Sequence, residues 1–244
     1  MPPLHRALLF CVLVGGMALL MFAGYMYFRA RLPATDVSMS RFPDLVQEAW
    51  RKRNQSAEEA RLRAIEASRE CVANGNRYCL MDDYPSALRE FRKAAELDAG
   101  NLDACLEIGR VAGLLKQMPV ARDGWQRALE LDLLAATAHA GLFEMLREGD
   151  EKERRRAFRH ALTLHVLSPH RPAPREFILL NPEIAREIEL VANDAADATL
   201  AALDSRALLA RAWEALPKEN QRTADACFGQ ILARFRVAEA QPGS

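Results

Sequence analysis

The chain has 244 residues, half of them hydrophobic (50%), and its 33 basic side chains are balanced by 33 acidic ones. The formal net charge is zero and the two signs are interspersed. The sequence therefore has no excess positive charge for binding nucleic acid and no acidic block typical of a disordered tail. The four cysteines beyond the N-terminal apolar run form no CxxC pair and are too widely spread for a disulfide framework, so we expect small core residues.

The N-terminal part of the chain contains an uncharged apolar run over residues 7–28, preceded by a short tail of residues 1–6. As a helix, the run would be about 33 Å long, which matches a hydrocarbon core of about 30 Å. It is longer than the apolar region of a secretory signal, and Arg29 to Pro33 make a poor cleavage site. The sequence therefore predicts a single-pass N-terminal transmembrane helix.

Two arguments about orientation oppose each other. Arg6 precedes the run and Arg29, Arg31 and Arg41 follow it, which slightly favours a cytoplasmic C-terminal part. A very short N-terminal tail instead favours export of the remainder. The soluble part is therefore expected to be periplasmic or cytoplasmic, and the sequence leaves the choice open.

Beyond the apolar run, small and aromatic residues recur with a period of 34 residues. Two antiparallel helices can pack closely only where a small side chain on one makes room for a large side chain on the other. The pattern therefore predicts packed pairs of helices. The residues expected to form this packing are Gly75, Tyr78, Ala87, Phe91, Ala94, Gly109, Ala121, Trp125 and Ala128.

This spacing resembles the tetratricopeptide repeat (TPR), a helix–turn–helix unit of about 34 residues. The sequence departs from the family at Cys71 and Cys105, where a large residue is usual, and at Ala99 and Leu133, where proline is common. The resemblance implies an all-α fold, a right-handed TPR-like solenoid of helical hairpins behind the single N-terminal transmembrane helix. The units would span about 68–101, 102–135 and 136–169, with two extra residues between the helices of the third.

The segment before the repeats is expected to be a juxtamembrane linker with a short helix, over residues 29–55. Pro43 would lie at the start of that helix. Ser56 and Glu59 have the spacing of a capping box, in which the serine caps the first turn and the glutamate bonds back to it. We therefore predict that a new helix begins at Ser56 and that the repeat region covers 56–169.

The C-terminal region, residues 170–244, shows no repeat register. His170 to Pro174 interrupt the helical pattern, and Asn181 followed by Pro182 is typical of a helix start. Two more helices are expected, around 200–216 and 222–240. We expect this all-helical region to cap the open end of the solenoid.

No pattern in the sequence indicates chemistry. GxSxG, P-loop and GxGxxG motifs are absent. His160, His165 and His170 are five residues apart, which turns each about 140° from the last on a helix, so they do not share a face as a metal-binding pair must. We predict no catalytic residue, cofactor or metal site, and a protein that is not an enzyme.

The resemblance to TPR proteins implies a concave groove, lined by the first helix of each unit, that binds a peptide or a helix of another protein. The alternative is that some groove positions pack against the protein's own flanking helices. The implied groove residues are Arg69, Val72, Asn76, Cys79, Leu80, Asp103, Leu106, Arg110, Gly113 and Leu114.

From the apolar run and the repeat together we expect a membrane-anchored TPR scaffold or adaptor. It would mediate protein–protein interaction in the assembly or recruitment of a membrane or envelope complex. The alternative is a homo-oligomeric structural protein assembled through its repeats. Contact with the membrane would run through residues 7–28, and no nucleic-acid partner is expected.

Overall fold

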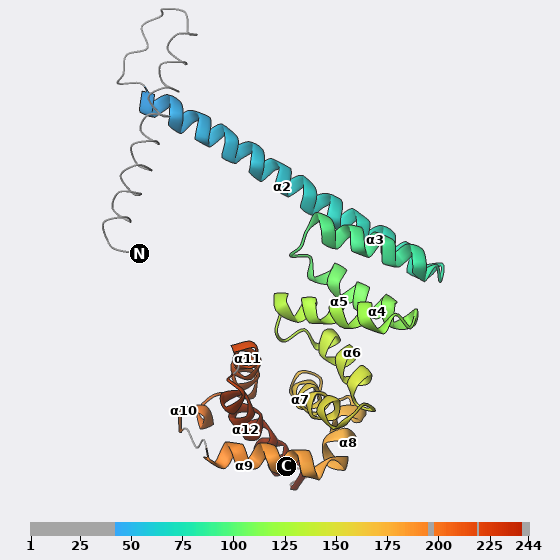
Figure 1. The fold of residues 1–244 in the computed structure, drawn as a ribbon, viewed down its shortest axis with the longest axis vertical. Coiled ribbons are helices and arrows are strands. Elements are labelled where there is room, and N and C mark those ends of the chain that lie inside the picture. The colour runs from blue at the N-terminus through green and yellow to red at the C-terminus, as the bar shows by residue number, and fades with distance from the viewer. Residues whose placement is uncertain (1–41, 195–197, 219, 241–244) are drawn as a thin grey trace, which may run out of the picture. The chain divides into compact units, whose positions relative to one another are not determined.

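A computed structural model of the chain describes residues 42–194, 198–218 and 220–240 (Figure 1). Every regular element in these ranges is a helix, which confirms the predicted all-α class. The membrane span predicted at residues 7–28 lies outside them. Among the helices that are described, none combines the length and the apolar composition needed to cross a bilayer.

Helix α2 runs without a break from Phe42–Leu80. The prediction that a new helix begins at Ser56 is therefore wrong. Ser56 lies inside α2, where its hydroxyl donates to the Arg53 carbonyl one turn back, at 2.9 Å. The sequence has neither proline nor glycine between Pro43 and Gly75, so nothing stops the helix. The division between the two units of the chain falls inside α2, between Glu59 and Ala60.

The helices that follow repeat their boundaries with the predicted period. Helix α3 (Tyr84–Leu97) and helix α5 (Met118–Leu131) have the same length, and their ends are 34 residues apart. The same offset separates the end of α2 from the end of α4 (Leu102–Leu114), and the start of α4 from the start of α6 (Ala136–Leu146). Helix α4 packs against α3, α5 and α6.

The turns that join these helices share one geometry. Asp82, after α2, and Lys116, after α4, have φ of 57° and 58°. In each turn the next amide bonds back to the preceding helix: Asp83 to the Tyr78 carbonyl at 3.0 Å and Gln117 to the Ala112 carbonyl at 2.9 Å. A left-handed residue at this place closes a helix end by satisfying its last carbonyls. Two sequences without glycine at that position therefore form the same turn.

The third helix pair is longer than the second. Helix α7 (Glu151–Leu167) ends 36 residues after α5 ends, so the pair contains two additional residues. Helix α6 is shorter than α4, and the extra length lies in the turn and in the first turn of α7. Asp150 caps α7 by accepting from the Glu153 amide at 2.8 Å.

In the described part of the C-terminal region the chain forms helices α8 to α12 and a short 3₁₀ helix. The predicted helix over 200–216 is in fact divided, because Asp204 caps a new helix by accepting from the Ala207 amide at 2.7 Å. Their bounds are α8 (Pro172–Leu180), α9 (Pro182–Asp194), α10 (Ala198–Ala201), α11 (Ser205–Ala215), η2 (Leu216–Lys218) and α12 (Gln221–Ala240).

One hydrophobic core extends from α6 to α12. Helix α12 packs against α7, α9 and α11, and its buried face includes Phe228, Ile231 and Leu232. These side chains belong to the same cluster as Phe143 of α6 and Phe158 of α7. The region without a repeat register therefore shares its core with the third helix pair.

Candidate binding surface

Glycines and aromatic rings meet at the helix contacts. A Cβ atom on Gly75 would lie 2.5 Å from Cε1 of Phe91, so the α3 ring lies directly against the α2 backbone. The same relation holds one period later, where a Cβ on Gly109 would meet the Trp125 ring. Each aromatic ring thus occupies the space that a glycine leaves.

The Trp125 ring fills a second space that the sequence did not reveal. A Cβ on Gly141, in α6, would also meet this ring, so a side chain of α5 contacts both α4 and α6. Gly141 follows Gly109 by 32 residues, so an alignment at a period of 34 places it out of register.

Of the residues predicted to form the packing, Tyr78 is 37% exposed and Trp125 is partly buried. The others are buried: Gly75, Ala87, Phe91, Ala94, Gly109, Ala121 and Ala128.

The implied groove residues form one stripe along α2 and a matching stripe along α4. Leu80 is 87% exposed and Leu114 is 53% exposed, although both are large apolar residues. Val72 and Leu106 are partly buried and pack against core clusters of the repeat helices. Cys79 and Gly113 are also partly buried, whereas four residues of the two stripes are exposed: Arg69, Asn76, Asp103 and Arg110.

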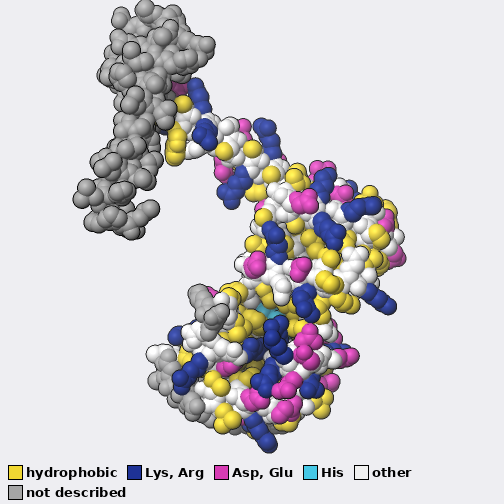
Figure 2. Space-filling model, viewed as in Figure 1, with side chains coloured by type: hydrophobic (Ala, Val, Ile, Leu, Met, Phe, Trp, Pro, Cys, Tyr) yellow, Lys and Arg dark blue, Asp and Glu magenta, His cyan; other side chains and the backbone are white. Residues whose placement is uncertain are grey.

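Arg110 is engaged within the protein. Its Nε donates to Glu107 Oε2 at 2.8 Å, and its Nη2 lies 3.4 Å from the Cys79 sulfur on α2. Gly113 faces inward, because a Cβ there would lie 3.5 Å from Cη2 of Trp125. The solvent-facing part of α4 therefore ends in the exposed Leu114, beside an arginine whose charge is largely neutralised. Basic, acidic and apolar side chains are interspersed over the face seen in Figure 2.

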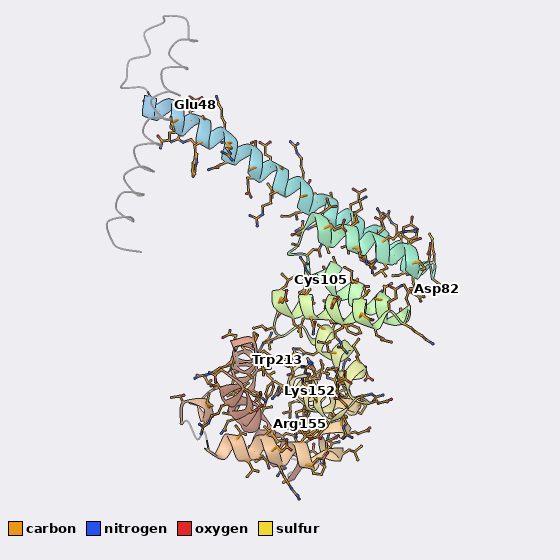
Figure 3. All side chains as sticks on the ribbon, viewed as in Figure 1. Glu48, Asp82, Cys105, Lys152, Arg155 and Trp213 are labelled. Carbon is orange, nitrogen blue, oxygen red and sulfur yellow. The ribbon has the colours of Figure 1, made fainter. Side chains whose placement is uncertain are left out.

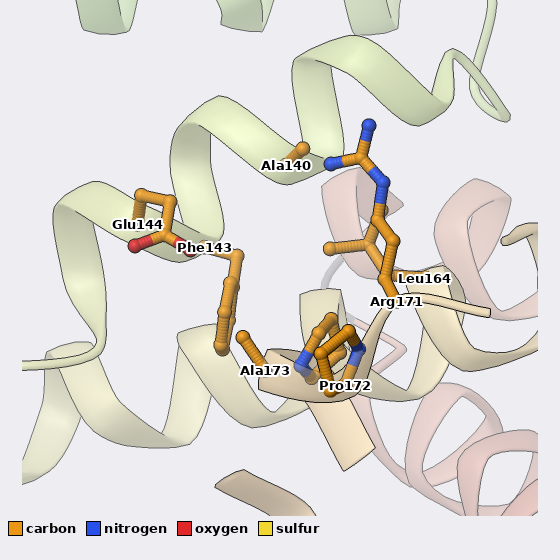
Figure 4. A pocket seen from close by; sticks show the side chains of 8 residues that line it. Ala140, Phe143, Glu144, Leu164, Arg171, Pro172 and Ala173 are labelled. Carbon is orange, nitrogen blue, oxygen red and sulfur yellow. The ribbon is translucent and has the colours of Figure 1, made fainter. Parts of the chain in front are cut away.

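One period beyond Leu106 and Arg110, the stripe continues on α6 as Ala140 and Glu144. These two residues line a pocket of about 250 Å³ (Figure 4). Arg171 lies at this pocket and forms no ion pair with any residue that the structure describes. The sequence did not predict this pocket, since its walls come from separate helices. The rest of the wall is Phe143, Leu164, Pro172, Ala173 and Pro174.

Two buried histidines form a hydrogen-bonded pair between α6 and α7. Nδ1 of His139 lies 2.8 Å from Nδ1 of His160, and Nε2 of His139 lies 2.9 Å from the Leu133 carbonyl. A carbonyl can only accept, so Nε2 of His139 carries the hydrogen and its Nδ1 accepts from His160. The pair was not foreseen, because the residues are 21 positions apart on different helices.

Trp213 of α11, which is labelled in Figure 3, packs against both histidine rings. Its ring centroid lies 4.8 Å from that of His139 and 4.9 Å from that of His160. The indole donates to Thr163 Oγ1 at 2.9 Å, and that hydroxyl donates to the Arg159 carbonyl at 2.8 Å. Three helices therefore meet at a buried polar cluster that hydrogen bonds and ring contacts hold together.

Burial keeps both rings neutral. It lowers the pKa of His139 to about 4. Burial also holds the pKa of His160 well below its usual range, helped by repulsion from His139, Arg159 and Arg156. The described residues contain no group of three or more side chains placed to bind a metal ion. His165 lies elsewhere on α7, edge-on to Phe235 at 4.8 Å.

Compared with known proteins, the chain matches no family model and no curated protein. The likeness to the tetratricopeptide repeat therefore depends on the 34-residue spacing of helix ends and on the glycine–aromatic contacts.

Proposed function

We propose that this chain is a membrane-anchored scaffold whose TPR-like repeats form a right-handed solenoid and bind a peptide or helix of another protein. The observation that carries the proposal is the 34-residue repetition of helix ends, turns and glycine–aromatic contacts from α2 to α6. Stacked helix pairs of this kind give an extended surface rather than an enclosed active site. The anchor is proposed from the uncharged run at residues 7–28.

The binding surface that we propose follows the first helices of the units. It includes the exposed Leu80 on α2 and Leu114 on α4 and continues to the pocket beside Ala140 and Glu144. Exposed leucines at matching positions of successive units are typical of surfaces that bind apolar side chains of a partner. The helices from α8 to α12 would then cover the far end of the repeats.

The test uses the full chain, crosslinked in membranes and purified with whatever it binds. The double variant Leu80→Asp/Leu114→Asp places two charges on the proposed surface, where both side chains are more than half exposed. The matched control is Leu97→Asp/Leu131→Asp, which changes two partly exposed leucines with the same spacing at the ends of α3 and α5.

The proposal expects crosslinked partners to be lost with the first variant and kept with the control. Partners that survive both changes, or that are lost equally with both, would contradict a binding surface on α2 and α4. If the first variant instead lowers the mass of the purified particle in light scattering, the partner is a second copy of the chain. A phosphatase fused to the C-terminus decides between periplasmic and cytoplasmic placement.

A further inference from the structure

The first part of α2 carries an apolar face that no described residue covers. Every described side chain between Asp44 and Arg63 is exposed. Val46 and Trp50 are 52% and 65% exposed, and because they are four residues apart they share one face of the helix. The two side chains together form an exposed apolar patch on this part of the helix.

The opposite face of the same segment is charged and internally paired. Lys52 Nζ lies 2.8 Å from Glu48 Oε1. Glu48 follows Val46 by two residues and Lys52 follows Trp50 by two, so each lies roughly 200° around the helix from its apolar neighbour. Glu48 is labelled in Figure 3. Arg51 and Arg53 adjoin Trp50 at about 100° and 60° on either side. The segment is thus amphipathic, with the basic residues Arg51 and Arg53 at the border between its faces.

We propose that residues 44–53 of α2 lie in the headgroup region of an anionic bilayer. Val46 and Trp50 would point toward the acyl chains, and Arg51 and Arg53 would contact lipid phosphates. Helical segments with one apolar face and bordering cations bind membranes in this way, and tryptophan prefers the membrane–water interface. The inference rests on the proposed membrane anchor.

The length of chain before α2 supports a lipid surface as the partner. Thirteen residues, 29–41, separate the predicted span from the start of α2. Fully extended they reach about 45 Å at most, so the first turns of α2 are held near the bilayer. A coiled-coil partner is a poorer fit, because the apolar stripe ends after two turns, where Asn54 follows Trp50, whereas a coiled coil needs several heptads.

The experiment measures how close Trp50 lies to lipid. The full chain is reconstituted into phosphatidylcholine vesicles containing phosphatidylglycerol, with and without brominated acyl chains, which quench nearby indoles. The variant Trp50→Phe/Gln55→Trp keeps three tryptophans but moves one about 140° around the helix, to the charged side. Trp125 and Trp213 are partly buried in the protein and common to both chains.

The inference expects brominated lipid to quench a component of the wild-type emission that is lost in the double variant. It also expects Arg51→Gln/Arg53→Gln to reduce that component. Equal quenching of wild type and Trp50→Phe/Gln55→Trp would overturn it, as would vesicles that carry the protein without quenching Trp50. Protein that fails to float with the vesicles would refute the anchor as well. A doubled mass in detergent, with Trp50 shielded from lipid, would assign this face to a second copy.

Discussion

Two glycines of α4, Gly109 and Gly113, differ in the space that is left for a side chain. At Gly109 an added methyl group would meet the Trp125 indole, whereas at Gly113 it would lie 3.5 Å from Cη2 of the same ring, an ordinary contact. We expect Gly109→Ala to lower the free energy of unfolding by about 1–3 kcal/mol, as overpacking does.

Gly113→Ala is the matched control in the same helix. It should leave the free energy of unfolding unchanged or raise it by about 0.4–1 kcal/mol, because alanine restricts the unfolded chain. Urea denaturation of the full chain in detergent measures both. Equal losses for the two variants would show that the indole does not require the space above Gly109.

A buried serine joins α2 to the turn after α3. The Ser68 hydroxyl donates to the Ala94 carbonyl at 2.8 Å and accepts from the Asn101 side-chain amide at 2.8 Å. Ser68→Ala should cost about 1–3 kcal/mol, since it removes both hydrogen bonds, although the Ala94 carbonyl still accepts from the Asp98 amide. Ser56→Ala, in the exposed part of the same helix, should have no measurable effect in the same denaturation experiment. A similar loss at Ser56 would contradict this explanation.

At the scale of elements, the histidine pair links the stability of the contact between α6, α7 and α11 to pH. An unfolded histidine binds its proton near pH 6.5, but burial lowers the pKa of folded His139 to about 4. As pH falls below 6.5, the unfolded chain takes up a proton that folded His139 does not. The free energy of unfolding therefore falls, by about 3 kcal/mol for this group once pH 4 is reached.

The window between about pH 6.5 and 5 isolates the histidines, because unfolded carboxylates bind protons only at lower pH. The melting temperature of the full chain should fall across this window. His170→Gln, at an exposed turn position away from both rings, should give the same profile as the wild type. A melting temperature that stays constant from pH 6.5 to 5 would contradict a neutral buried pair.

Contacts between helices could be predicted from the sequence where a glycine in one helix matches an aromatic residue in the next. Glycine and aromatic residues at 75, 91, 109 and 125 are local signs of close packing, and the structure brings each pair into contact. Helix boundaries were less predictable, because a serine such as Ser56 serves equally as a cap or as an interior residue. The histidine pair and the pocket beside Arg171 depend on tertiary contacts between separate helices, for which the sequence gives no local signal.

At the scale of the whole molecule, the third helix pair and the C-terminal helices should unfold together. They share one hydrophobic core, and a mostly buried ion pair joins them: Arg159 Nη2 lies 2.8 Å from Asp225 Oδ1, with the two side chains 16% and 11% exposed. Asp225→Asn should lower the free energy of unfolding by about 1.5–3 kcal/mol, since the hydrogen bond to a charged group is weakened inside the protein.

Hydrogen exchange checks whether this loss is shared. Protection should fall by the same factor in α7 and α12, although they are far apart in the sequence. Glu187→Gln is the control, because its ion pair with Arg155 joins α7 to α9 on the exposed surface and should contribute much less. Loss of protection confined to α12 would show that the C-terminal helices open independently of the repeats.

The double contact of Trp125 also has an evolutionary consequence. One indole fills the space left by Gly109 on one side and by Gly141 on the other, so a change at any of the three positions alters the fit at the other two. A smaller residue at 125 would leave two cavities, and a larger one at 109 or 141 would clash. Among divergent relatives these three positions should therefore covary, with loss of the tryptophan accompanied by bulkier residues at both glycine sites.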